Sequence, residues 1–163
     1  MTESVADPSE RIQWTLSVTL RREMRERKGW QFPAWSLADI APDERKPGLV
    51  ESNPAKATHD FCWTGLRLSL QRSNAETYWY NLTSQTPSLF VICREDPQYG
   101  LVPSMISIDQ DESAREQESE GEIFSVPMPR WIIDALERFV MTHYRPEPRG
   151  GKRRRKPQAA ADE

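Results

Sequence analysis

The sequence predicts a mostly-β α+β fold, in which an antiparallel six- to seven-stranded sheet or partly open barrel packs on one C-terminal helix. Three observations predict this class. Polar and apolar residues alternate over residues 13–20, and similar short runs recur up to residue 126, which is typical of strands with one buried face. Short turns separate the runs and favour antiparallel pairing, because parallel partners need a long crossover. Residues 129–144 then change to helical spacing.

Three strands are expected in the first half of the chain, at residues 13–22, about 30–40 and about 60–72. The first places its apolar residues on one face and its polar residues on the other. Residues 21–29 contain seven charged side chains and predict a charged turn. Pro33 requires that the second strand lie at a sheet edge or be broken there. Residues 41–58 predict a loop.

The segment at 65–82 predicts a β-hairpin. Residues 73–76, Ser-Asn-Ala-Glu, have the composition of a turn. Tyr78 to Leu82 is expected to be the returning strand. In that arrangement the aromatic run at residues 78–80 places rings on both faces of one strand.

The remaining strands are expected at 89–93, at about 101–108 and at 123–126. The run 89–93 is apolar on both faces, which predicts a central strand that is covered on both sides. The acidic stretch 109–120 predicts a short solvent-facing helix or a loop.

The last element is predicted to be a helix over about 129–144. Pro129 suits the first helical position, because its missing N–H would be unpaired there. One apolar stripe follows at helical spacing, made of Ile132, Leu136, Phe139, Val140 and His143. The domain plan is therefore a disordered N-terminus (1–10), one globular β-rich domain (11–146) and a flexible basic tail (147–163).

Charge and composition limit the functional classes. The 163 residues carry a net charge of −3, but residues 149–163 hold six basic and two acidic side chains. Residues 1–148 therefore carry 16 basic and 23 acidic side chains, a net charge of −7. No apolar run is long enough to cross a bilayer, and the acidic start lacks a secretory signal. A cytoplasmic protein without a membrane partner is expected, with Cys62 and Cys93 as free core thiols.

Catalytic and metal-binding patterns are weak. The chain has two histidines, and the spacing of His59 and Cys62 is a slight indication of a metal site. Either cysteine could in principle pair with His143, but no spacing selects such a pair. No glycine-rich phosphate loop is present. We therefore expect a protein that is not an enzyme and holds no metal or cofactor.

Candidate partner-binding residues come from the predicted hairpin and from the tail. Aromatic and arginine side chains are common anchors of protein interfaces, although such rings also fill small barrels. Arg67 and Trp79 could form a cation–π contact across the hairpin. The tail could bind nucleic acid, anionic lipid or acidic protein, or fold onto the acidic stretch 109–122. The expected contact residues are Arg67, Trp79, Asn81, Arg94, Arg153, Arg154 and Arg155.

Several strings resemble a bacterial family. They are Gly65-Leu-Arg-Leu-Ser-Leu70, Glu76-Thr-Tyr-Trp-Tyr-Asn-Leu82, Pro87-Ser-Leu-Phe-Val-Ile-Cys-Arg94, Val126-Pro-Met-Pro129 and Tyr144-Arg-Pro-Glu-Pro148 with its basic run. Together they are similar to the domain of unknown function family 3305, over about residues 13–157. The resemblance implies a location beside formate dehydrogenase and molybdenum-enzyme maturation genes, an iron–sulfur protein and a chaperone. It implies an accessory or assembly role and supplies no catalytic residues.

The leading hypothesis is a non-catalytic accessory protein that binds a component of a formate dehydrogenase-type redox system. Its partner would be a redox-enzyme subunit or the chaperone of that subunit, docked on the polar face of the 65–82 hairpin. One alternative is a nucleic-acid-binding protein that uses the basic tail. The other is a small-ligand-binding or enzymatic domain with a pocket between sheet and helix.

Overall fold

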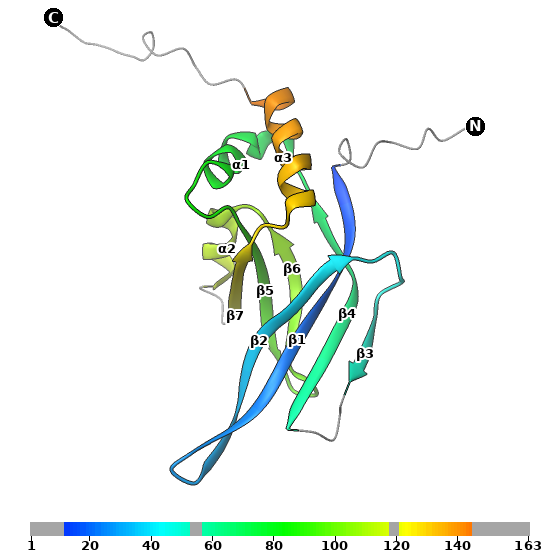
Figure 1. Cartoon of the computed structure of the whole chain (residues 1–163), viewed down its shortest axis with the longest axis vertical. Coiled ribbons are helices and arrows are strands. Elements are labelled where there is room, and N and C mark those ends of the chain that lie inside the picture. Colours follow the sequence, from blue (N-terminus) through cyan, green and yellow to red (C-terminus); the bar gives the residue numbers. More distant parts are fainter. Residues whose placement is uncertain (1–11, 53–56, 118–120, 145–163) are drawn as a thin grey trace, which may run out of the picture.

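Two antiparallel sheets and three α-helices make up the fold in the computed structural model, which describes residues 12–52, 57–117 and 121–144 (Figure 1). The mostly-β α+β class is therefore confirmed. The elements are β1 (Gln13–Arg27), β2 (Trp30–Pro42), β3 (Gly48–Ser52), β4 (Thr58–Ser69), a 3-10 turn η2 (Arg72–Asn74), α1 (Ala75–Leu82), β5 (Ser88–Asp96), β6 (Gly100–Ser107), α2 (Gln110–Gln117), β7 (Gly121–Pro127) and α3 (Arg130–His143).

The strands divide into a four-stranded sheet of order β2-β1-β4-β3 and a three-stranded sheet of order β6-β5-β7. Each pairing is antiparallel, as the short connections predict. Pro33 lies in β2, an edge strand, where its missing N–H breaks no ladder bond. The doubly apolar run 89–93 lies in β5, the centre of the second sheet. Both positional predictions are confirmed.

The core lies between the two sheets and α3. Its largest fully buried side chains include Leu16 and Leu20 from β1, Leu89 from β5, and Ile132 and Leu136 from α3. The alternation in β1 and the apolar stripe of α3 both point at this core, which confirms the two strongest periodic patterns. Removing these apolar surfaces from water is the main term that stabilises the fold.

The two cysteines are free thiols in different settings. Cys93 lies in the core, whereas Cys62 is half-buried. Burial, with a smaller effect of the Glu122 carboxylate, raises the pKa of the Cys93 thiol to about 12, because a thiolate is poorly solvated there. Cys93 is therefore a packing residue at neutral pH rather than a nucleophile.

The predicted hairpin over 65–82 is wrong, because residues 75–82 form helix α1 instead of a returning strand. Ala75 and Tyr78 share its buried side, and the Tyr78 ring lies 5.9 Å from the ring of Phe139 on α3. The Tyr78 hydroxyl also accepts a hydrogen bond from the backbone N–H of Gln71 at 2.9 Å. Packing against α3 therefore overrides the strand preference of the aromatic run. Arg67 and Trp79 are consequently not cross-strand neighbours.

Two segments predicted as irregular contain strands. The charged segment 21–29 is mostly strand, since β1 continues to Arg27 and the connection to β2 is the two-residue turn Lys28-Gly29. Both turn residues have positive φ (54° and 81°), which matches the twist of a tight hairpin. The segment predicted as a loop at 41–58 contains β3. The acidic stretch forms the short helix α2, one of its two predicted states.

The ends of the chain were predicted to be a disordered N-terminus and a flexible tail, and both lie outside the described residues. Within the residues that the structure describes, no helix combines the length and apolar composition that a bilayer crossing needs. Helices α1 and α3 pack against each other at one end of the molecule, and the β1–β2 hairpin projects from the other end (Figure 1).

Candidate interaction surface

The structure separates the predicted contact residues. Arg67 is exposed on β4 and lines a cavity of about 200 Å³ that also includes Tyr78, Asp109 and Glu112. Arg94 is exposed on β5. Trp79 lies on α1, where its ring is 38% exposed and 5.9 Å from the ring of Tyr144. The tail residues Arg153, Arg154 and Arg155 lie outside the described residues.

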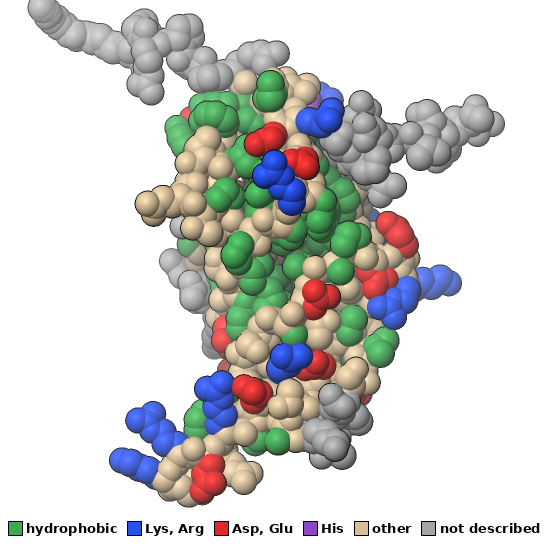
Figure 2. Space-filling view, in the orientation of Figure 1, with side chains coloured by type: hydrophobic (Ala, Val, Ile, Leu, Met, Phe, Trp, Pro, Cys, Tyr) green, Lys and Arg blue, Asp and Glu red, His purple; other side chains and the backbone are tan. Residues whose placement is uncertain are grey.

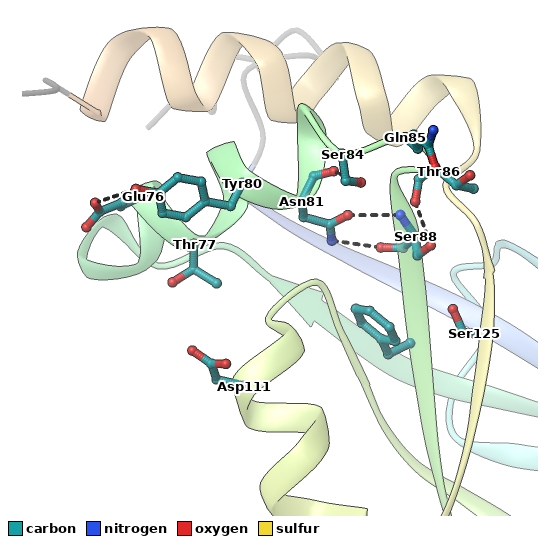
Figure 3. A pocket seen from close by; sticks show the side chains of 11 residues that line it. Glu76, Thr77, Tyr80, Asn81, Ser84, Gln85, Thr86, Ser88, Asp111 and Ser125 are labelled. Carbon is teal, nitrogen blue, oxygen red and sulfur yellow. Dashed lines mark hydrogen bonds between the residues drawn. The ribbon is translucent and has the colours of Figure 1, made fainter.

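Asn81 has a structural use in the fold. Its Nδ2 donates to the backbone carbonyl of Ser88 and its Oδ1 accepts from the backbone N–H of Ser88, both at 2.9 Å (Figure 3). Its Nδ2 also donates to the backbone carbonyl of Ile108 at 2.9 Å. These bonds use both N–H donors of the amide and one lone pair of its oxygen. Asn81 therefore joins the end of α1 to β5 and to the segment after β6.

An open groove of about 730 Å³ lies between α1 and α2 (Figure 3). Phe90 of β5 and Ser125 of β7 also line it. Glu76 and Asp111 contribute carboxylates from the two helices, and the Tyr80 hydroxyl donates to Glu76 at 3.2 Å. Its other polar groups are mostly hydroxyls. No His, Cys, Lys or Arg is among the lining residues. The groove is therefore lined by hydroxyl, amide and carboxylate groups together with the rings of Tyr80 and Phe90.

His59 and Cys62, the two residues of the predicted metal pattern, both lie on β4 but do not face each other. His59 pairs with Arg22 of β1, whereas Cys62 pairs with Thr19. Three residues apart on a strand, their side chains point to opposite faces of the sheet. Among the residues that the structure describes, no three His, Cys, Asp or Glu side chains come together to hold a metal ion.

The most unusual surface is the projecting end of the β1–β2 hairpin, which we call the arm (residues 21–32). It exposes three large apolar side chains: Trp30 (77%), Met24 (40%) and Phe32 (40%). It also holds five basic and two acidic side chains, and the cluster of Lys and Arg at the lower left of Figure 2 covers its tip. Exposed aromatic side chains beside arginine are characteristic of protein interfaces.

The base of the arm is held by Arg22. Its guanidinium carbon lies 5.3 Å from the ring centre of Phe61 and 6.0 Å from that of Trp35. Its Nη2 donates to Nδ1 of His59 at 3.1 Å, and His59 Nε2 lies 2.9 Å from a carboxylate oxygen of Glu51. A guanidinium has no acceptor atom, so Nδ1 must accept and Nε2 carries the proton donated to Glu51. We call this chain of contacts the Arg22 brace. It runs from Arg22 on β1, through His59 on β4, to Glu51 on β3.

A second contact also fixes the root of the arm. Arg21 donates to both carboxylate oxygens of Asp60 on β4, at 2.8 and 3.0 Å. The hydrogen bond from Arg21 lowers the pKa of the Asp60 carboxyl below its usual value, since it favours the charged form. Arg21 and Arg22 point to opposite faces of β1, so the arm is anchored on both faces of the sheet.

We expect His59→Ala to lower the free energy of unfolding by about 2 kcal/mol, because it removes both hydrogen bonds of the brace and the Phe61 stacking partner. Glu51→Gln is the matched control: it keeps an oxygen that can accept from Nε2 and should cost less than about 1 kcal/mol. Urea denaturation followed by tryptophan fluorescence measures both. Equal midpoints for His59→Ala and the unmodified protein would show that the brace contributes no stability.

Sequence reasoning missed both the arm and the brace. Met24 is the one apolar residue within 21–28, so the alternation of β1 does not continue there, and a lysine and a glycine follow at 28 and 29. A Lys-Gly turn lacks the Asn-Gly or Asp-Gly signature of a two-residue hairpin. The high charge therefore favoured a turn in the prediction, where the chain instead forms paired strands.

Comparison with known proteins gives one match. The profile of the family described as "Protein of unknown function (DUF3305)" matches residues 15–156, most of the chain. Neither the curated proteins nor the solved structures contain a match. The resemblance that the sequence motifs indicate is thus confirmed at the level of the family, and the chain belongs to the DUF3305 family.

Proposed function

We propose that this protein is a non-catalytic accessory factor that binds a protein component of a formate dehydrogenase-type redox system, and that the arm is its contact surface. The observation that carries the proposal is the exposure of Trp30, Phe32 and Met24 on a projecting, braced hairpin. Contact between aromatic rings and water is unfavourable, so a partner that covers these rings lowers the free energy of the complex.

The class of partner comes from the resemblance rather than from the arm. The resemblance to the family implies gene neighbours for formate dehydrogenase and molybdenum-enzyme maturation, an iron–sulfur protein and a chaperone, and on that basis we propose a role in assembling such an enzyme. The partner would be an enzyme subunit or its chaperone. An arm of this kind suits that role, because a short hairpin can insert into a pocket without a large complementary face.

The test is affinity purification of the tagged, full-length protein from its native host, with redox-enzyme subunits and chaperones quantified by mass spectrometry. We expect Trp30→Ala to reduce recovery of such a component at least about tenfold, because tryptophans at interfaces are frequent binding hot spots. Removing an exposed side chain should leave the unfolding midpoint almost unchanged.

Met141→Ala is the matched control, because Met141 on α3 is equally exposed (76%) but lies far from the arm. It should leave recovery unchanged. The proposal is wrong if no redox-enzyme subunit or chaperone is recovered, or if Trp30→Ala and Met141→Ala recover it equally. A chain truncated after Pro148 measures the contribution of the basic tail in the same assay.

A further inference from the structure

We infer that the arm recognises an acidic protein surface with an apolar pocket at its centre. This inference rests on the proposed function and adds the chemistry of the contact. It follows from how the strand register distributes side chains over the two faces of the arm, from the ion pairs on those faces, and from the backbone of its turn.

The register places basic and aromatic residues together on one face. Arg25 is the Cα partner of Phe32, and Arg27 is the Cα partner of Trp30. Residues directly opposite in an antiparallel pair project from the same face, and residues two apart on one strand do so as well. These four side chains therefore form one surface, which we call the recognition face.

The opposite face differs in chemistry. There Met24 is the Cα partner of Pro33, and Glu26 is the Cα partner of Gln31. The exposed rings are therefore gathered on the recognition face, beside Arg25, Arg27 and one carboxylate, Glu23, whereas the other face holds Arg22, Met24 and Glu26. This segregation gives the arm a direction from which a partner approaches.

The cations of the recognition face keep free hydrogen-bond donors. Arg25 forms one ion pair, with Glu23 at 3.0 Å, and both side chains are exposed (61% and 44%). Neither Arg27 nor Lys28 forms an ion pair within the part of the chain that the structure describes. A guanidinium has five N–H donors in a planar fork that matches a carboxylate. Carboxylates around a pocket that receives Trp30 would therefore complement this face.

The turn places Lys28 at the tip of the arm. Its φ of 54° lies in the left-handed region, where glycine or asparagine is the usual residue. A lysine there costs conformational energy, and no ion pair or hydrogen bond within the described residues offsets it. The two-residue turn requires a positive φ at both positions, so this cost belongs to the turn, and the exposed ammonium of Lys28 adds to the positive charge of the arm.

The distribution of charge favours a protein over a nucleic acid. Outside the arm, residues 1–148 carry 11 basic and 21 acidic side chains, a net charge of −10. A nucleic acid places phosphates at regular intervals along its length, so a strand extending past the arm would meet this negative body. An acidic patch on a protein is limited in area, so it can contact the arm without approaching the negatively charged remainder of the chain.

The direct test uses the full-length protein and three defined probes in isotope-edited NMR titrations, with the Trp30 indole N–H as reporter. The first probe is a short synthetic peptide in which Asp and Glu flank a Leu-Phe pair. The second is its uncharged twin, with Asn and Gln in place of the acids, and the third is a single-stranded oligodeoxynucleotide of equal charge. We expect the acidic peptide to shift Trp30 and to bind at least about tenfold more tightly than its twin.

Two substitutions test the charges without removing the aromatic anchors. Arg27→Glu should lower the affinity for the acidic peptide at least about tenfold. Lys28→Asn should weaken it by a smaller factor while leaving the unfolding midpoint unchanged or raised, since asparagine tolerates the left-handed region. Arg138→Glu, a charge reversal at an exposed site on α3, is the control and should leave binding unchanged.

The outcomes separate this inference from the proposed function. If the oligonucleotide binds the recognition face more tightly than the acidic peptide, the partner is a nucleic acid and the inference is wrong. It is also wrong if the uncharged twin binds as well as the acidic peptide. If Trp30→Ala prevents recovery of the redox component while Arg27→Glu and Lys28→Asn do not, the arm binds but its partner is not acidic, and the proposed function stands.

Discussion

Gly65→Ala is expected to lower the free energy of unfolding by about 3 kcal/mol or more. Gly65 has a φ of +82°, and a Cβ added there would lie 2.6 Å from both Cα and Cγ of Pro47. Real Cβ atoms do not approach a backbone carbon this closely, so β4 and the segment before β3 would have to separate. Urea denaturation followed by circular dichroism and tryptophan fluorescence measures the loss.

Gly65 occupies this position because of a register shift. The β1–β4 pairing is regular on either side but changes register between Leu16 and Val18, where Gly65 lies opposite on β4. Such bulges commonly place a glycine at positive φ. The extra residue is in β4, so Trp63 and Leu66, three positions apart, pair with Val18 and Leu16, which are both fully buried.

Gly48→Ala is the matched control, because Gly48 lies in the neighbouring strand β3 without a positive φ. The nearest atom to its added Cβ would be the Thr64 hydroxyl oxygen at 3.7 Å, an ordinary contact. We expect a change of less than about 1 kcal/mol, of either sign. If Gly65→Ala unfolded at the same urea concentration as Gly48→Ala, the close approach of Pro47 to β4 would be wrong.

The sequence predicts the elements that bury one face against the core. The alternation of β1 and the stripe of α3 are strong because every second or every third to fourth residue must be apolar to fill the space between the sheets. The doubly apolar run of β5 is explained in the same way, since one face meets the core and Ile92, on the other face, is also buried. Because one face of each segment is buried, its apolar residues recur at a fixed spacing, and this spacing is visible in the sequence alone.

The elements that sequence reasoning missed are stabilised by partners distant in the chain. Tyr78 and Trp79 have strand preferences, but α1 forms because Tyr78 packs on Phe139 about sixty residues later. The arm has two exposed faces, so no apolar period marks it, and its base is held by side chains of β3 and β4. The predicted contact surface of Arg67, Trp79 and Asn81 depended on the hairpin and is divided among different elements instead.

Asn81→Leu is expected to lower the free energy of unfolding by about 2–3 kcal/mol, on the basis of roughly 1 kcal/mol for each of its three side-chain hydrogen bonds. The substitution removes this partner from the N–H and carbonyl of Ser88, which is half-buried, and from the carbonyl of Ile108, which is buried. Helix α1 would then lose its link to β5. Denaturant unfolding monitored by circular dichroism gives the value.

Two further variants decide whether Asn81 supports the fold or contacts a partner. Asn81→Asp keeps the oxygen that accepts from Ser88 but loses both donors, so it should be intermediate in stability. Ser84→Ala removes a nearby exposed hydroxyl that donates to the Asn81 carbonyl at 2.6 Å, and it should cost less than about 1 kcal/mol. A ranking of stability in this order assigns Asn81 to the fold. If Asn81→Leu instead kept full stability while recovery of the redox component fell, the residue would be a contact, and the binding surface would extend from the arm to the opposite end of the molecule.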